Sequence, residues 1–131
     1  QSRQVNNFIN WCKQQPWYDN TTIVITGDHK SMSEKFFDNI DSNYVRTPYN
    51  CIINSAVEAK NNKNRSFSTM DMYPTILAAM GAKIEGDRLG LGTNLFSDKQ
   101  TLMEELGFKT LDNELQKTSN YYNQKILEEK D

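Results

Sequence analysis

The sequence has no long apolar run. Its longest aliphatic stretch, Ile23-Val24-Ile25, has the length of a strand and is far shorter than the roughly 20 residues of a membrane-spanning helix. The chain also opens without the basic residues and apolar core of a signal peptide, so we expect no such leader within it. Gln1 instead begins directly in an amphipathic segment, which is typical of a fragment cut from a longer protein.

Cysteine and net charge are both low. Cys12 and Cys51 are too few for a disulfide framework and lack the C-x-x-C spacing of a zinc or redox motif, so we expect both to be buried as small hydrophobic residues. The formal net charge is −2, from 15 basic and 17 acidic residues that are interspersed. No basic stripe is present to bind a phosphate backbone, and nucleic acid is therefore not an expected partner.

A P-loop is missing as well. The glycine-rich stretch 86–92 contains no Walker lysine, and no helix signal follows it directly. The length of 131 residues, with 37% hydrophobic and 24% charged content, is typical of one ordinary globular domain.

The first half of the chain predicts a helix followed by two strands. The helix is expected over residues 2–15, because apolar side chains recur on one face, at Val5, Phe8, Ile9 and Cys12. The β-branched run 22–26 predicts a strand buried on both faces, as in a parallel sheet. A polar excursion over 30–47 leads to a second strand at 49–54.

The second half predicts further helices after an exposed loop at 58–65. Asp71 is expected to cap a helix that Gly81 ends in the left-handed conformation. A capping-box pattern of Ser97 with Gln100 predicts a short helix, and a terminal helix is expected on one apolar stripe, formed by Leu111, Leu115, Tyr122 and Ile126.

The residues with the clearest chemistry are Asp28 and His29, which directly follow the first strand. Ligands in open α/β sheets bind beyond the carboxyl ends of the strands, and a carboxylate with an imidazole suits zinc or manganese. Gly27 is expected to let the backbone turn so that both side chains reach one ion. On this tetrapeptide alone, a capping aspartate beside a surface histidine is the more common interpretation.

Three segments of the sequence stand out, in order. The first is the stretch from Gln15 to His29, which ends in Thr-Gly-Asp-His. The second is Asp71-Met72-Tyr73-Pro74-Thr75-Ile76-Leu77, and the third is Arg88-Leu89-Gly90-Leu91-Gly92-Thr93-Asn94-Leu95-Phe96. Together they resemble the sulfatase-like branch of the alkaline-phosphatase superfamily, which contains lipoteichoic acid synthase and phosphoglycerol transferases, and the third is similar to a loop typical of the phosphoglycerol branch. The resemblance runs from about Gln1 to Ser97.

This resemblance implies an α/β fold, in which the chain is the C-terminal part of a mostly parallel sheet flanked by helices. Residues 1–131 are then the C-terminal portion of one sulfatase-like catalytic domain, whose N-terminal half carries the nucleophile and is absent here. Such a half is expected to expose an apolar sheet edge and to self-associate.

For the site, the resemblance implies that Asp28 and His29 are metal ligands. The metal is expected to be Mn²⁺, with Mg²⁺ or Zn²⁺ as alternatives, and to be shared with a glutamate and a nucleophilic threonine far upstream. The catalytic nucleophile is therefore unknown in this chain, because neither Thr26 nor Thr69 occupies its position. Arg46 is a candidate for binding a substrate phosphate, although a surface ion pair is the commoner role for such an arginine.

The implied activity is the transfer of glycerol phosphate from phosphatidylglycerol to a cell-envelope glycan or teichoic acid. The donor lipid and the glycan acceptor are the expected partners, the catalytic domain is expected outside the cytoplasmic membrane with membrane spans upstream, and the fragment alone is expected to be inactive. One alternative is a sulfatase or phosphoethanolamine transferase of the same superfamily. Another is a non-catalytic module that binds a glycan or a protein partner.

Overall fold

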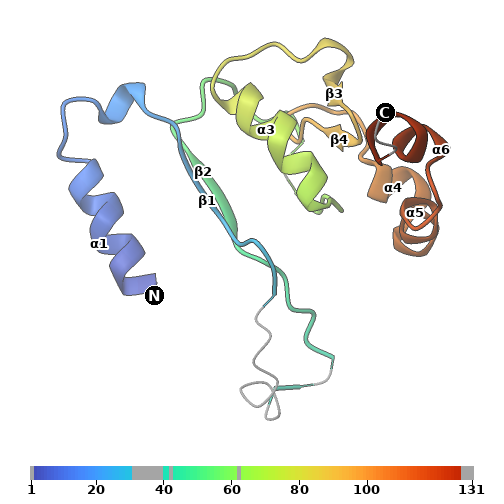
Figure 1. Cartoon of the computed structure of the whole chain (residues 1–131). Helices are drawn as coiled ribbons and strands as arrows, with labels where there is room; N and C mark the ends of the chain where they lie inside the picture. Colours follow the sequence, from blue (N-terminus) through green and yellow to red (C-terminus); the bar gives the residue numbers. More distant parts are fainter. Residues whose placement is uncertain (1, 31–39, 42, 62, 128–131) are drawn as a thin grey trace.

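The computed structural model describes residues 2–30, 40–41, 43–61 and 63–127 and shows an α/β chain of short elements (Figure 1). The helices and strands are α1 (Ser2–Cys12), β1 (Ile23–Thr26), β2 (Asn50–Ile53), α3 (Met72–Ala79), β3 (Arg88–Leu89), β4 (Gly92–Thr93), α4 (Leu102–Leu106), α5 (Phe108–Leu115) and α6 (Asn120–Tyr122). Short 3₁₀ turns precede β1, α3 and β3, and a π-helical turn follows α6. None of the helices in the described ranges is long and apolar enough to cross a membrane.

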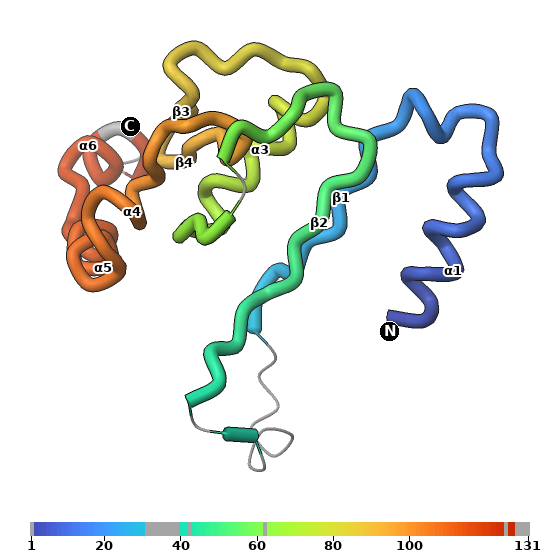
Figure 2. Tube along the Cα trace, turned by 180° about the vertical axis from the view of Figure 1, so that it is seen from behind, coloured from blue at the N-terminus to red at the C-terminus, as the bar shows by residue number. Residues whose placement is uncertain are grey.

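The β1–β2 ribbon stands between α1 on one side and α3 with the C-terminal elements on the other, as both views show (Figures 1 and 2). The chain is far from spherical: its accessible surface is 10682 Å². A compact monomer of 15.2 kDa is expected to expose roughly 7100 Å². The open surface includes large apolar side chains such as Phe8 and Trp11, and self-association stays a prediction.

The described strands pair antiparallel. This corrects the expectation that residues 22–26 form a strand buried on both faces, as in a parallel sheet. Ile23 lies opposite Ile53 and Thr26 opposite Asn50, while β3 and β4 form a second antiparallel pair. The apolar residues of β1 are half-buried and not buried on both faces, because β2 is the only strand that pairs with it among the described residues. A mostly parallel sheet is thus not seen in these pairings.

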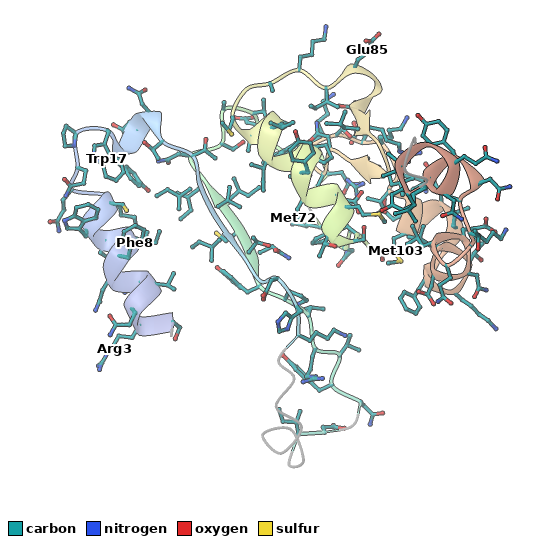
Figure 3. The ribbon with its side chains drawn as sticks, in the orientation of Figure 1. Arg3, Phe8, Trp17, Met72, Glu85 and Met103 are labelled. Atoms are coloured by element: carbon teal, nitrogen blue, oxygen red, sulfur yellow. The ribbon has the colours of Figure 1, made fainter. Side chains whose placement is uncertain are left out.

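Helix α1 ends earlier than residue 15 and buries only part of its apolar face. Ile9 and Cys12 are buried, whereas the Phe8 side chain remains 56% exposed. Three aromatic rings meet here, with the Phe8 and Trp11 centroids 5.9 Å apart and those of Trp11 and Trp17 also 5.9 Å apart. Figure 3 shows Phe8 and Trp17 on the α1 side of the ribbon and Met72 on the opposite side. The prediction of a buried cysteine is confirmed for Cys12, while Cys51 is half-buried.

The best-packed part of the chain joins α3 to β4 through buried polar groups. Asp71 is 2% exposed, and its carboxylate accepts hydrogen bonds from the Ser68 amide at 2.8 Å and from the Thr93 amide at 2.7 Å. The Thr75 hydroxyl donates to the Asp71 carbonyl at 2.6 Å and accepts from the Leu95 amide at 2.9 Å. Asp71 therefore forms a capping box with Ser68 and ties the helix start to β4, instead of capping α3 directly.

The two glycines of the Gly90-Leu91-Gly92 turn are required for two different reasons. Gly90 has a φ of 60°, and a Cβ built there meets no atom within 4 Å. Gly92 is buried, and a Cβ there would overlap the Met70 carbonyl oxygen and lie 3.1 Å from Cδ of Pro74. Gly90 thus provides a left-handed turn, and Gly92 allows the backbone of β4 to approach the start of α3.

Gly92→Ala is expected to lower the free energy of unfolding by about 2 kcal/mol, because backbone atoms must move to admit the methyl group. Gly90→Ala is the matched control and is expected to lower it by about 1 kcal/mol, through the strained positive φ alone. Urea denaturation of the two variants measures both effects. An equal or larger loss in Gly90→Ala would contradict the close approach at Gly92.

Candidate metal centre

The turn that carries Asp28 and His29 is held by the opposite strand. The Gly27 amide donates a hydrogen bond to the Tyr49 carbonyl at 3.0 Å, which continues the β1–β2 ladder by one residue. A Cβ on Gly27 would lie 3.1 Å from Cβ of Pro48. Gly27 does not have a positive φ, so its role differs from the expected sharp turn. It allows Pro48 to pack against the backbone directly before Asp28.

Asp28 and His29 point their polar atoms toward each other. Oδ1 of Asp28 accepts a hydrogen bond from the His29 amide at 2.8 Å, and Oδ2 lies 3.4 Å from Nε2 of His29. The side chains are open to solvent, with 86% of Asp28 and 57% of His29 exposed. The structure therefore brings the two predicted ligands together on an accessible surface.

The hydrogen bond at the other ring nitrogen selects the histidine tautomer. Nδ1 of His29 lies 2.7 Å from the Lys30 carbonyl oxygen. A carbonyl oxygen can only accept, so Nδ1 carries the hydrogen, and in the neutral ring Nε2 has the free lone pair. An Nδ1–H bonded to a backbone carbonyl is the usual way in which proteins orient a metal-binding histidine.

The pair fits a divalent cation as two of its ligands. Two donors that each lie about 2.0–2.2 Å from one ion are roughly 3.4 Å apart in a tetrahedral arrangement. The measured separation of Oδ2 and Nε2 is 3.4 Å. A carboxylate oxygen and a nitrogen lone pair at this distance repel each other unless a proton or a metal ion lies between them.

Two ligands are fewer than a catalytic metal site needs. In the part of the chain that the structure describes, no group of three or more His, Cys, Asp or Glu side chains is arranged to hold a metal ion. A catalytic zinc site has three protein ligands. Asp28 and His29 are thus half of a candidate centre.

The other sequence candidates lie apart from this pair or have different partners. Arg46 is half-buried in the segment that leads to β2 and has an interaction partner of its own, and its role toward a substrate stays a prediction. Arg88 has a structural role, because it donates to the Gln100 carbonyl at 2.9 Å and to Glu105 at 2.7 Å. Most of the excursion expected over 30–47 lies outside the described residues.

A cavity of about 210 Å³ lies beside β2, away from the candidate ligands. Its walls are mostly apolar and include Cys51 and Ile52 of β2, with Phe67, Met72 and Phe96 from the C-terminal half. Neither Asp28 nor His29 lines it, so the exposed pair and this cavity are separate features.

The chain matches a known protein family. The model of the sulfatase family, described as Sulfatase, matches residues 2–82, which is more than half of the chain. The chain therefore belongs to the sulfatase family, within the alkaline-phosphatase superfamily of hydrolases and transferases. No curated protein and no solved structure matches it.

The matched range contains two of the three segments on which the resemblance was based. Asp28 and His29 lie inside it, as does the start of α3, whereas the loop from Arg88 to Phe96 lies beyond residue 82. That loop is the segment on which the resemblance to the phosphoglycerol branch was based. The match thus establishes the family and leaves the particular reaction to be argued from the site.

Proposed function

We propose that this chain is part of a metal-dependent enzyme that transfers glycerol phosphate from phosphatidylglycerol to a cell-envelope glycan or teichoic acid. The observation that carries the proposal is the Asp28–His29 pair, with Oδ2 and Nε2 3.4 Å apart at the carboxyl end of β1 in a sulfatase-family chain. The Arg88–Phe96 segment favours the phosphoglycerol branch over other members of the superfamily.

Asp28 and His29 supply the ligands that this chain contributes. The Asp28 carboxylate brings a negative charge and an oxygen donor, and His29 presents Nε2 because the Lys30 carbonyl holds Nδ1–H. When bound, a divalent ion, Mn²⁺ by preference and Mg²⁺ or Zn²⁺ as alternatives, lowers the pKa of a nucleophilic hydroxyl and offsets negative charge on the phosphoryl oxygens. Arg46 is proposed as a further contact to substrate phosphate.

The remaining parts of the centre are proposed to lie outside this chain. They include the nucleophilic threonine, a glutamate ligand and the strands that would complete a mostly parallel sheet around β1. The 10682 Å² of accessible surface supports this proposal, because it leaves apolar faces of the ribbon and α1 for other elements to cover. We further propose membrane spans upstream and a catalytic domain outside the cytoplasmic membrane.

The test uses the complete catalytic domain that contains this chain, with Mn²⁺ and vesicles of phosphatidylglycerol. We expect release of diacylglycerol in equal amounts to glycerol phosphate transferred to protein or acceptor, measured by mass spectrometry. An aryl sulfate and phosphatidylethanolamine are the matched substrates for the two alternatives within the superfamily. Turnover of either one, with none of phosphatidylglycerol, would overturn the proposed reaction and leave the family assignment intact.

A further inference from the structure

The connection from β1 to the Asp28–His29 pair is fixed by one cross-strand side-chain contact. Thr26 is the last residue of β1 and lies directly opposite Asn50, the first residue of β2. The Thr26 hydroxyl donates a hydrogen bond to Oδ1 of Asn50 at 2.6 Å. Only Gly27 separates Thr26 from Asp28, so this bond is made two residues before the first candidate ligand.

Asn50 is itself restrained from two sides. Its side-chain amide donates a long hydrogen bond of 3.5 Å to the Pro48 carbonyl, and its half-buried side chain forms part of the wall of the apolar cavity. The amide orientation that places the oxygen on Thr26 and the nitrogen on Pro48 uses both groups of the side chain. An aliphatic side chain of similar size at this position would leave the Thr26 hydroxyl without this acceptor.

The two neighbouring residues of the same segment act on Gly27. The Tyr49 carbonyl accepts from the Gly27 amide at 3.0 Å, and Pro48 would be 3.1 Å from a Cβ at Gly27. Successive residues from Pro48 to Asn50 thus contact the last residue of β1 and the glycine after it. Among the residues that the structure describes, Asp28 and His29 are held by their own local bonds and by the Lys30 carbonyl.

We propose that Asn50 is a positioning residue for the metal pair, and that it acts through the Thr26 hydroxyl to fix where the chain leaves β1. This inference rests on the proposed metal-binding role of Asp28 and His29. Groups that orient ligands from outside typically change metal affinity about 10-fold to 100-fold when they are removed. The expected effect is a change in metal affinity, which can be measured without catalytic turnover.

The experiment uses this chain and Mn²⁺ as the probe. His29 is the only histidine in the sequence, so its two ring C–H signals in the proton NMR spectrum need no further assignment. Mn²⁺ bound at Nε2 broadens these signals, and the concentration that gives half-maximal broadening reports the affinity. We expect Thr26→Val, which keeps the side-chain shape, and Asn50→Ala each to raise this concentration about tenfold.

The matched variants separate positioning from general stability. Thr26→Ser keeps the hydroxyl and is expected to bind Mn²⁺ within about twofold of the unsubstituted chain. Thr21→Val removes a hydroxyl that donates to the Trp17 carbonyl at 2.9 Å, before the start of β1, and is expected to leave Mn²⁺ binding unchanged. The double variant of Thr26→Val with Asn50→Ala should bind no more weakly than either single variant, since both remove the same bond.

Each outcome bears on the inference in a definite way. Weakened binding in Thr26→Val and Asn50→Ala, with recovery in Thr26→Ser, supports it. Equal effects of Thr26→Val and Thr21→Val, or no effect of Thr26→Val while Asp28→Asn weakens binding, would overturn the positioning role and leave the metal pair intact. If Mn²⁺ fails to broaden the His29 signals of the unsubstituted chain, the positioning role is wrong, and the role of the metal pair is then decided by the metal content of the complete domain and of its His29→Ala variant.

Discussion

Replacing His29 with alanine in the complete catalytic domain is expected to reduce turnover about a thousandfold, together with loss of the bound metal. The reason lies in the geometry of the pair. His29 supplies Nε2, oriented by the 2.7 Å bond from Nδ1 to the Lys30 carbonyl, and Asp28 supplies Oδ2 at 3.4 Å from it. Without the imidazole, one carboxylate remains from this chain. Metal content after dialysis and the rate of diacylglycerol release measure the two losses.

Asp28→Asn is expected to have a similar effect, because it keeps the shape of the side chain and removes its charge. Asp98→Asn is the matched control: Asp98 is exposed in the loop before α4, and its loss should change neither metal content nor turnover. A His29→Ala domain that keeps its metal and its rate would exclude His29 as a ligand. An unsubstituted domain without turnover, whose affinity for a glycan or protein partner is unchanged by His29→Ala, would instead favour the non-catalytic module.

Local elements could be predicted from the sequence because their signals are local. The strand expected at 49–54 is β2, over Asn50–Ile53, and the helix expected after Asp71 is α3, which Gly81 follows with a φ of 90°. β-Branched residues and glycine are sufficient signals for both. The pairing of β1 could not be predicted in this way. A run of β-branched residues favours a strand, but its partner and direction are set by tertiary contacts.

The short helix α4 shows how a tertiary contact selects between equivalent local signals. Both Ser97 with Gln100 and Thr101 with Glu104 fit the capping-box pattern, and the structure uses the second. Glu104 also binds Arg65, which lies in a segment expected to be an exposed loop. The expected terminal helix is likewise interrupted, because Ser119 caps a new helix with its side chain.

At the candidate site, the sequence predicted the two candidate ligands but not the contacts that hold them. Asp28 and His29 are adjacent, so a strand followed by this pair is visible in the sequence alone. Asn50 acts on Thr26 from 24 residues away, and no periodicity or motif marks an asparagine at the start of a strand as its partner. The Lys30 carbonyl is a backbone group, which no residue type reveals.

The most connected side-chain contact in the described part of the chain is the ion pair of Arg65 and Glu104. Nε of Arg65 donates to Glu104 at 2.8 Å and Nη2 at 3.0 Å, and the two side chains are 7% and 19% exposed. The carboxylate also accepts from the Ser66 amide at 3.2 Å and the Thr101 amide at 2.9 Å. The pair joins a residue inside the range matched by the family model to one beyond it.

These donors, above all the Arg65 guanidinium, lower the pKa of Glu104 from 4.5 to about 2. Because the pKa in the folded chain is below that of the unfolded chain, the unfolded chain binds more protons at acid pH, and stability rises with pH. The contribution is complete above about pH 5 and is lost as the pH falls toward 2. A shift of this size corresponds to about 3 kcal/mol.

Glu104→Gln is therefore expected to lower the free energy of unfolding by about 3 kcal/mol at pH 7, and by progressively less as the pH falls from 5 toward 2. Urea denaturation at a series of pH values measures this difference. Glu114→Gln is the control, because Glu114 pairs with Lys117 at 2.6 Å with half of its side chain exposed, and such surface pairs contribute at most about 0.5 kcal/mol. If the free energy of unfolding of Glu104→Gln fell between pH 5 and pH 2 as steeply as that of the unsubstituted chain, the pKa of Glu104 would not be lowered in the folded chain.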